Sequence, residues 1–173
     1  AATLSRARKG ILARIARLAA LVPSGSKSRI HGDLHLGQVL VAQDDVYVID
    51  FEGEPQRTLA ERREKTSPLR DVAGILRSLD YAAWSALDRM RSRTGSIEPR
   101  VRDRALAWRD AAAAEFMAAY EATAGDAGFL PDVKLRRALL ELFLIQKAAY
   151  EIQYEAANRP SWLSIPVRGL LSI

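Results

Sequence analysis

Apolar residues in the segment 4–22 recur near the spacing of one helix face, with arginines between them, and predict a helix there. Helix-starting and helix-ending residues and an alanine-rich stretch predict three more helices, over residues 68–90, 98–123 and 131–158. Serine favours the N-cap and proline the first turn, so Ser67 and Pro68 mark the start of the second helix. Proline also ends helices, at Pro23 after the first and at Pro160 after the fourth, which is predicted to be the longest.

Between the first two helices the pattern changes to short runs of β-branched residues. Residues 39–42 and 46–49 form two such runs around the polar segment 43–45, and this arrangement predicts a β-hairpin. Residues 53–66 carry Gly, Pro and a run of charges, and they predict a loop. The chain is therefore expected to be mainly α with a small β-hairpin, as a single domain over residues 1–173.

Composition narrows the kind of protein. The 173 residues include 49% apolar and 27% charged residues, which is ordinary for a globular domain. There is no cysteine, which excludes a disulfide framework and a thiolate metal site. No apolar run reaches about 18 residues, and the first residues lack the features of a signal peptide. We therefore expect a cytoplasmic protein with no membrane partner.

Positive charge is concentrated at the start of the chain. The net charge is +5, and residues 1–30 hold seven Lys or Arg and no acid, whereas the rest has 19 basic and 21 acidic residues. Basic segments can bind nucleic acid, but neither an aromatic platform nor a recognition-helix motif accompanies this one. We expect a helix with a solvated basic face, or one that packs on an acidic segment outside the chain, and no nucleic-acid partner.

Candidate chemistry lies in a catalytic loop, residues 29–38, and a metal loop, residues 46–54. The first contains Asp33 and, five residues later, Gln38, while the second contains Asp50 at the end of the second β run. In phosphoryl transfer a carboxylate accepts the proton of the attacking hydroxyl, while an amide oxygen and a second carboxylate hold Mg²⁺ against the nucleotide phosphates. The spacing therefore predicts Asp33 as catalytic base, and Gln38 and Asp50 as the residues that bind Mg²⁺ and ATP. Taken alone, Asp33 would be interpreted as a turn aspartate.

The two loops, with His-Gly-Asp at residues 31–33 and Ile-Asp-Phe at residues 49–51, resemble those of the protein-kinase-like superfamily, in its aminoglycoside-phosphotransferase-like branch. The resemblance implies that the chain is the helical C-terminal lobe of a kinase-like fold, with ATP bound between two lobes. The Gly-rich loop, strand lysine and five-stranded sheet of the N-terminal lobe have no counterpart in the sequence. We therefore expect the N-terminal lobe to be a missing partner, and activity of this chain alone stays open.

The resemblance also assigns roles to residues around the loops. It implies that His31 is a structural histidine behind the catalytic loop and that Asp71 accepts hydrogen bonds from the loop backbone. The sequence departs from the family pattern at Gln38, where asparagine is usual, and at Glu52, which replaces a glycine. Glu52 or Glu54 then either approaches the metal or lies in solvent.

The last predicted helix, taken over residues 131–160, carries a second group of polar side chains. At about 100° per residue, six of them share an arc of roughly 140°. They are Lys147, Tyr150, Glu151, Tyr154, Glu155 and Asn158. Carboxylates and tyrosine rings bind sugars through hydrogen bonds to hydroxyls and ring stacking, so this face predicts a sugar site. The alternative is a solvated face with Lys147 and Glu151 as an i,i+4 pair.

Four motifs together resemble the bacterial maltokinases. They are His-Gly-Asp-Leu-His-Leu-Gly-Gln at 31–38, Ile-Asp-Phe-Glu-Gly-Glu-Pro at 49–55, Ser-Pro-Leu-Arg-Asp-Val-Ala-Gly at 67–74, and the segment 147–160. The resemblance implies ATP-dependent phosphorylation of maltose to maltose 1-phosphate, in glycogen-type α-glucan synthesis from trehalose, with a fusion to or complex with trehalose synthase. The maltose site that it implies consists of His35, Lys147, Tyr150, Glu151, Tyr154 and Glu155.

Three alternatives remain open from the residues themselves. The chain could serve a kinase for an aminoglycoside or another amino-bearing substrate, although Lys147 argues against the strongly acidic pocket that such a substrate needs. It could be a non-catalytic sugar-binding lobe. It could also be a metal-dependent hydrolase built on His31 and His35, which would need at least one further zinc ligand.

Overall fold

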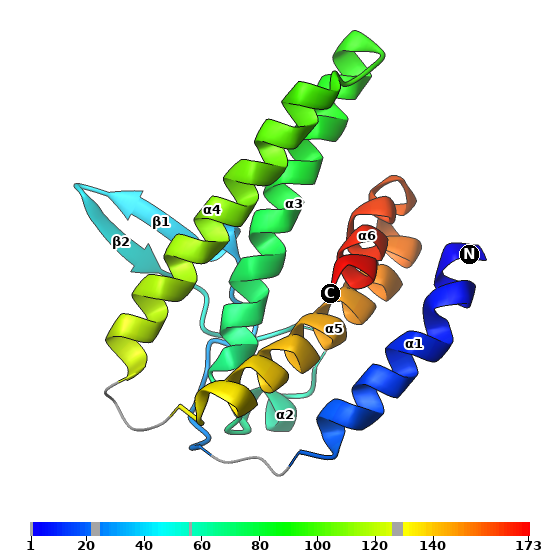
Figure 1. Ribbon diagram of the computed structural model, residues 1–173. Helices are drawn as coiled ribbons and strands as arrows, with labels where there is room; N and C mark the ends of the chain where they lie inside the picture. Colours follow the sequence, from blue (N-terminus) through cyan, green and yellow to red (C-terminus); the bar gives the residue numbers. More distant parts are fainter. Residues whose placement is uncertain (1, 22–24, 56, 126–129) are drawn as a thin grey trace.

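The computed structural model describes residues 2–21, 25–55, 57–125 and 130–173, and it is mostly helical (Figure 1). The helices are α1 (Ala2–Ala19), α2 (Leu59–Arg63), α3 (Leu69–Thr94), α4 (Pro99–Ala124), α5 (Val133–Asn158) and α6 (Ser164–Ser172). The remaining elements are the 3₁₀ turns η1 (Leu36–Gln38) and η3 (Pro160–Trp162) and the strands β1 (Val39–Ala42) and β2 (Asp45–Val48). The predicted fold class, mainly α with one hairpin, is confirmed.

Helix α3 is the centre of the packing. Figure 1 shows α3 and α4 as a long antiparallel pair, with α5 against the lower half of α3; α6 contacts both α3 and α5, and α1 packs on α5 and α6. The buried apolar residues of α3 recur at helical spacing and form most of the core; they are Leu69, Val72, Ala73, Ile75, Leu79, Ala83 and Leu87. The buried apolar residues of α5 and α6 are Leu135, Ile145, Ala148 and Ile165. The core therefore lies between α3 and the α5–α6 pair.

The hairpin forms where the sequence predicts it. Its strands pair antiparallel, with Val39 opposite Val48, and Gln43 and Asp44 form the turn between them with φ of 53° and 60°. Two successive residues with positive φ match the right-handed twist of the strands. The strands are largely exposed, with Val41 at 76% and Val46 at 59%, and Figure 1 shows the hairpin extending away from the helices. Exposed apolar side chains of this kind are typical of a surface that another segment or chain covers.

Both ends of the second predicted helix differ from the prediction. The second helix begins at Leu69 with Pro68 as its N-cap, and the Ser67 hydroxyl accepts only a long hydrogen bond, 3.4 Å, from the Leu69 amide. It also continues beyond Met90, because the chain first leaves the helix at Gly95, which has the left-handed φ of 78° that glycine favours. Helices α3, α4 and α5 each have 26 residues, so the fourth predicted helix is not the longest.

The prediction also missed two helices and placed the end of the first helix too late in the chain. The predicted loop 53–66 contains α2, which starts with a capping box in which Thr58 and Glu61 bond each other's backbone amides. The helix α6 follows Pro160, where no further helix was predicted. The predicted first helix extends to Val22, whereas α1 ends at Ala19, and the stop at Pro23 lies outside the described residues.

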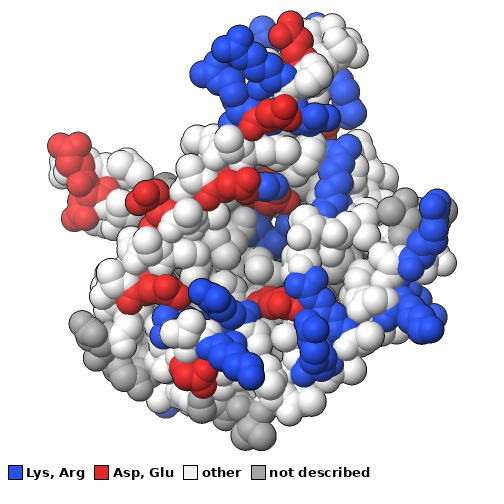
Figure 2. Space-filling view, in the orientation of Figure 1, with Lys and Arg blue, Asp and Glu red and all other residues white. Residues whose placement is uncertain are grey.

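The basic start of the chain forms α1, which packs on α5 and α6. Arg14 pairs there with Glu141 of α5, so α1 has a partner within the chain. Figure 2 shows that Lys and Arg also gather over the far end of the α3–α4 pair, whereas acidic side chains gather at the tip of the hairpin. In the described part of the chain, no helix is both long and apolar enough to cross a bilayer.

Arg77 joins three helices through buried charge. Its side chain is 4% exposed, and its guanidinium donates to Glu151 of α5 at 2.9 Å (Nε to Oε2) and to Asp80 at 2.8 Å (Nη1 to Oδ2). Arg109 of α4 donates to the other oxygen of Asp80 at 2.9 Å. Gly169 of α6 lies so close to the guanidinium that a Cβ there would clash with it. Burial by itself lowers the pKa of Arg77, but the charges of Glu151 and Asp80 outweigh this effect and raise it.

Replacing Arg77 by Met should lower the free energy of unfolding by about 3–5 kcal/mol, because Glu151 is then buried without its cation. Urea denaturation measures the loss. Arg91→Met is the matched control, since Arg91 pairs with Asp88 on the same helix but its side chain is 55% exposed. Its loss should stay below about 1 kcal/mol. Equal losses in the two variants would contradict the structural role of Arg77.

Candidate active site

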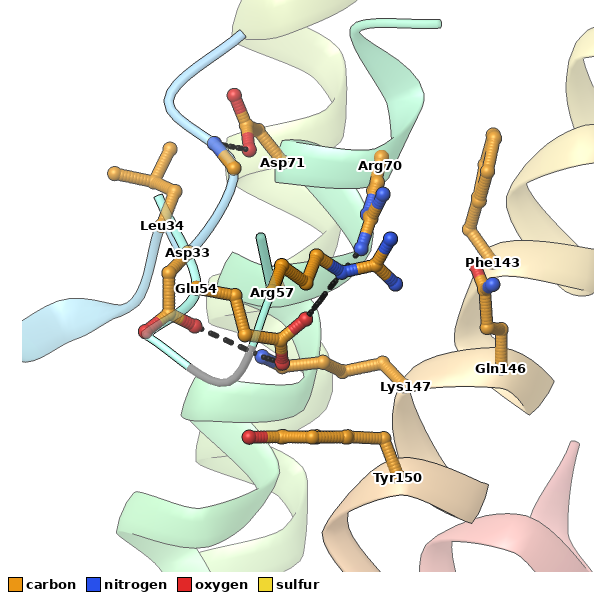
Figure 3. A pocket seen from close by; sticks show the side chains of 12 residues that line it. Asp33, Leu34, Glu54, Arg57, Arg70, Asp71, Phe143, Gln146, Lys147 and Tyr150 are labelled. Carbon is orange, nitrogen blue, oxygen red and sulfur yellow. Dashed lines mark hydrogen bonds and ion pairs between the residues drawn. The ribbon is translucent and has the colours of Figure 1, made fainter. Parts of the chain in front are cut away.

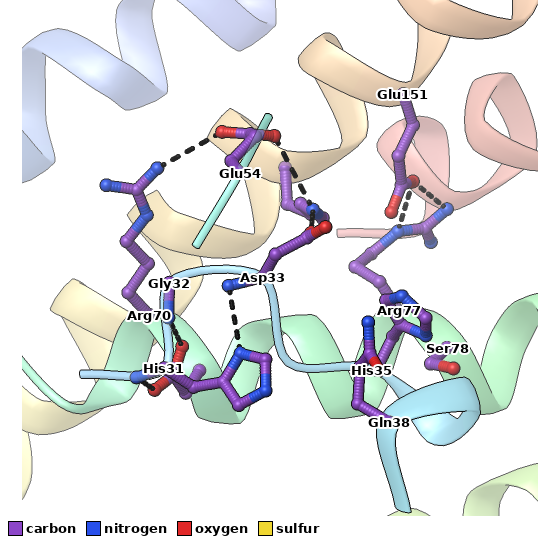
Figure 4. A network of polar contacts seen from close by, with 12 residues as sticks. His31, Gly32, Asp33, His35, Gln38, Glu54, Arg70, Arg77, Ser78 and Glu151 are labelled. Carbon is purple, nitrogen blue, oxygen red and sulfur yellow. Dashed lines mark hydrogen bonds and ion pairs between the residues drawn. The ribbon is translucent and has the colours of Figure 1, made fainter. Parts of the chain in front are cut away.

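One carboxylate of α3 fixes the start of the catalytic loop. Asp71 accepts hydrogen bonds from the backbone amides of His31 (2.7 Å, to Oδ2) and Gly32 (2.9 Å, to Oδ1), and Figure 4 draws both as dashed lines from these two labelled residues. Burial raises the pKa of the Asp71 carboxyl, although both hydrogen bonds act in the opposite direction. Gly32 has a φ of 88°, and a Cβ there would press on the Gly53 backbone, so the turn requires glycine. Asp71 thus lies where the resemblance places it.

His31 connects the catalytic loop to the metal loop. It is 5% exposed, its Nδ1 accepts from the Asp33 amide at 3.3 Å, and its Nε2 lies 2.7 Å from the carbonyl oxygen of Ile49. Because Nδ1 is the acceptor, the ring proton is on Nε2 and is donated to Ile49. The ring also packs on Phe51, with the ring centres 4.8 Å apart.

Both ring nitrogens of His31 therefore serve the backbone and not a metal. His35 caps η1, and its Nδ1 accepts from the Gly37 amide at 3.1 Å. Among the residues that the structure describes, no group of three or more His, Cys, Asp or Glu side chains is arranged to hold a metal ion. The hydrolase alternative would need such a group around the two histidines, whereas ring nitrogens of both side chains bond the backbone: Nδ1 and Nε2 of His31, and Nδ1 of His35.

Helix α3 also meets the catalytic loop directly. Gly74 faces the carbonyl oxygen of Leu34 so closely that a Cβ would clash with it. One turn further along α3, the Ser78 hydroxyl accepts from the Leu36 amide at 2.9 Å. The loop is thus held at three successive positions along one side of the helix.

Asp33 points towards α5 and forms an ion pair with Lys147, with Oδ1 and Nζ 3.0 Å apart (Figure 3). Lys147 also lies 3.8 Å from Glu54 of the metal loop. Glu54 is 4% exposed and contacts Arg57 at 2.8 Å and Arg70 at 3.6 Å. Glu54 is therefore not the solvated acid that the sequence allowed, but a buried carboxylate surrounded by three cations.

Gln38 and Asp50 lie side by side near the surface, since the Gln38 amide nitrogen donates to Asp50 Oδ2 at 2.8 Å. Asp50 has a φ of 66°, a left-handed conformation that aspartate tolerates better than most residues. Asp50 is exposed and follows an exposed strand. The charge of Asp50 is therefore not buried, and the two loops bring a carboxylate beside an amide side chain that is bonded to it through its nitrogen.

A cleft of about 490 Å³ separates the catalytic loop from α5. Its lining includes all of the predicted substrate residues, namely His35, Lys147, Tyr150, Glu151, Tyr154 and Glu155, together with Asp33. Asn158, which shares their helix face in the sequence, instead donates to the Tyr154 carbonyl oxygen at 2.9 Å. Ser78, Tyr81 and Arg159 also line the cleft and were missed: the first two lie outside the four motifs, and Arg159 lies within the segment 147–160 but was given no role.

The two glutamates of the cleft are each bonded to an arginine. Glu155, which is 1% exposed, accepts from Arg159 at 2.6 and 2.9 Å and from the Tyr81 hydroxyl at 3.2 Å. Glu151 bonds Arg77, and burial raises the pKa of Glu151 in spite of that charge. The pair that the sequence offered as an alternative, Lys147 with Glu151, is not the contact that forms, because Lys147 reaches Asp33.

Two tyrosines form the aromatic wall of the cleft. The rings of Tyr150 and Tyr154 stack with centres 6.3 Å apart. Lys147 lies over the first ring, 5.2 Å from its centre, and Arg159 lies 5.4 Å from the centre of the second. Burial and the charge of Glu54 raise the pKa of Tyr150 to about 12, so its hydroxyl keeps its proton at neutral pH.

Known proteins of one enzyme family are similar to this chain in sequence. The model of the phosphotransferase enzyme family (APH) matches residues 2–103. The chain is 31% identical to a glucosamine kinase of Streptacidiphilus jiangxiensis over 83% of its length, and 35% identical to a glucosamine kinase of Mycolicibacterium smegmatis over 81%. It covers 31% and 33% of these proteins, so it spans about a third of the length of the curated relatives it matches.

Solved structures show the same likeness. A glucosamine kinase in complex with glucosamine, ADP and inorganic phosphate matches with a TM-score of 0.82 and 26% identity, over 99% of this chain and 41% of that one. Crystal form B of a glucosamine kinase also matches with a TM-score of 0.82 and 28% identity, over 98% of this chain and 40% of that one. The kinase-like fold expected from the sequence is thus confirmed.

Gly74→Ala should destabilise the protein by about 1–3 kcal/mol, because the added methyl group pushes the Leu34 carbonyl and the catalytic loop away from α3. Gly10→Ala is the control, since Gly10 lies within α1 with open space around it. That change should stabilise by about 0.5–1 kcal/mol through helix propensity. Thermal unfolding measures both, and a change of the same sign in the two variants would contradict the close approach at Gly74.

Proposed function

The chain belongs to the phosphotransferase enzyme family, and we propose that it takes part in ATP-dependent transfer of a phosphoryl group to a sugar hydroxyl. One observation carries the proposal: Asp33 lies at the cleft wall that faces the tyrosine-bearing side of α5. A sugar in this cleft can present a hydroxyl to Asp33 while its ring contacts the tyrosines. Because the chain spans about a third of its curated relatives, the activity itself is part of the proposal.

Asp33 is the proposed catalytic base. Its loop is fixed by Asp71, His31 and Gly74, so the carboxylate has a defined position before substrate arrives. Lys147 contacts Oδ1, and we assign Oδ2 to the substrate hydroxyl. The carboxylate orients the hydroxyl towards the phosphoryl group and takes its proton as the new bond forms.

Gln38 and Asp50 are the proposed residues for Mg²⁺ and the ATP phosphates. Magnesium binds through one or two carboxylates plus phosphate oxygens and keeps several waters, so an exposed acid beside an amide suits it. The Gln38 amide N–H donates a hydrogen bond to Asp50, which leaves the amide oxygen for a cation. When bound, the ion would neutralise charge on the phosphates. The glutamine, where asparagine is usual, still offers this oxygen one methylene further out.

The tyrosines and glutamates of α5, together with His35 of the catalytic loop, divide into two proposed roles. We propose that Tyr150, Tyr154 and His35 contact the sugar, since they line the cleft and their rings offer stacking faces or a polar edge. Glu155 has both oxygens bonded within the protein, and Glu151 holds Arg77, so these acids shape the cleft before they contact any ligand. We therefore do not propose direct sugar contacts for the two glutamates, although the resemblance implies them.

Two sugars are candidates. Maltose is supported by the motif resemblance, together with its proposed place in α-glucan synthesis from trehalose and a link to trehalose synthase. Glucosamine is supported by the names of the similar proteins. The N-terminal lobe that a kinase-like fold requires is a proposed partner, as is ATP, and the exposed hairpin is a surface that such a lobe could cover.

Titration calorimetry of this chain with maltose and with glucosamine tests the proposal, because the cleft is formed by described residues alone. Tyr154→Ala should weaken sugar binding about tenfold, which is about 1.4 kcal/mol, as expected from loss of ring contact. Tyr47→Ala on the exposed hairpin is the control and should leave binding unchanged. Asp33→Asn should keep binding within about threefold and, in the protein joined to an N-terminal lobe, abolish phosphoryl transfer.

Folded protein that binds neither sugar would refute the sugar site. Binding that Tyr154→Ala leaves intact would place the sugar elsewhere. Sugar binding without ATP-dependent turnover in the protein joined to an N-terminal lobe would favour the alternative of a non-catalytic sugar-binding lobe. The sugar that binds at least tenfold more tightly identifies the substrate class.

A further inference from the structure

The charges along the cleft are balanced in pairs. Each of the three carboxylates among its described lining residues contacts a cation: Asp33 with Lys147, Glu151 with Arg77, and Glu155 with Arg159. An amino sugar carries an ammonium group, which needs a carboxylate or another acceptor that is still available. An ammonium group that approaches any of these three carboxylates therefore meets a cation already beside it.

The three pairs differ in how firmly they are held. The side chains of Arg77 and Glu151 are 4% and 11% exposed, and Arg77 is also bonded to Asp80. Glu155 is bonded through both oxygens. Asp33 and Lys147 are 24% and 25% exposed and share a single contact at 3.0 Å. The pair at the proposed catalytic base is therefore the one that a substrate meets and can rearrange.

Lys147 offers only donors. Its ammonium has three N–H groups, one of which bonds Asp33 while Glu54 attracts a second at 3.8 Å. The third can donate to a sugar hydroxyl or ring oxygen, because a hydroxyl has acceptor lone pairs. The ammonium of an amino sugar has no acceptor lone pair. Beside Asp33 it would also be repelled by the positive charge of Lys147.

We propose that Lys147 is a specificity-determining residue that makes the cleft prefer neutral sugars over cationic amino sugars. This inference rests on the proposed sugar site. Removing the positive charge of Lys147 should affect Asp33 more than Glu54. Glu54 keeps its contacts with Arg57 and Arg70, whereas Asp33 loses the cation that it contacts. Asp33 can then hold the ammonium group that Lys147 excluded.

The test compares glucose with glucosamine, which differ by one hydroxyl-to-ammonium exchange, with maltose as a second neutral sugar. Dissociation constants are measured by calorimetry near pH 6, where the amine is protonated. The wild-type chain should bind the better of the two neutral sugars at least tenfold more tightly than glucosamine. Lys147→Gln should lower this ratio at least tenfold, and thermal unfolding checks that the variant is folded.

Two further variants separate charge from structure. Lys147→Arg keeps the positive charge and should keep the wild-type preference. Lys134→Gln makes the same exchange at an exposed position of the same helix and should change nothing. Wild-type protein that prefers glucosamine, or a ratio unchanged in Lys147→Gln, would overturn the role of Lys147 while leaving the sugar site intact. Folded wild-type protein that binds none of the three sugars would overturn the proposed function, and this inference with it.

Discussion

The cleft depends on one buried guanidinium, that of Arg77. It bonds Glu151 of α5 and Asp80 of its own helix, and it lies directly under Gly169 of α6. A charge buried this deeply is costly unless its partners are fixed, so it holds α5 in one position against α3. The position of α5 in turn decides where Lys147 and the two stacked tyrosines meet the catalytic loop.

The same face of α3 also positions the catalytic loop. Asp71, Gly74, Arg77 and Ser78 stand at positions i, i+3, i+6 and i+7 of α3, which lie on one side of the helix. The first bonds two loop amides, the second lets the loop carbonyl approach, and the last bonds another loop amide. One helix face thus organises both walls of the cleft, and a change on it is expected to affect catalytic geometry and stability together.

Local patterns were enough to predict most of the elements, and they singled out residues that the fold brings to one cleft. Helical periodicity, proline and glycine indicated α1, α3, α4 and α5, and the β-branched runs indicated the hairpin. Its turn differs only slightly from the prediction, because two positive-φ residues suffice to close it. The helix α2 was missed although its capping box, Thr58 with Glu61, is visible in the sequence within a run of charges.

Long-range partners could not be predicted in this way. Lys147 and Asp33 are 114 positions apart, and Arg77 and Glu151 are 74 apart, so no spacing rule connects them. The same holds for Glu54, whose burial among cations follows from the tertiary fold and not from its polar neighbours in the sequence.

The central claim is that the cleft between the catalytic loop and α5 is a sugar site with Asp33 at its reactive end. A crystal structure of this chain grown with maltose or glucosamine tests it most directly. The account predicts a sugar ring against Tyr150 and Tyr154, with one hydroxyl within hydrogen-bonding distance of Asp33. A sugar bound away from Asp33, or an empty cleft at saturating sugar, would contradict it.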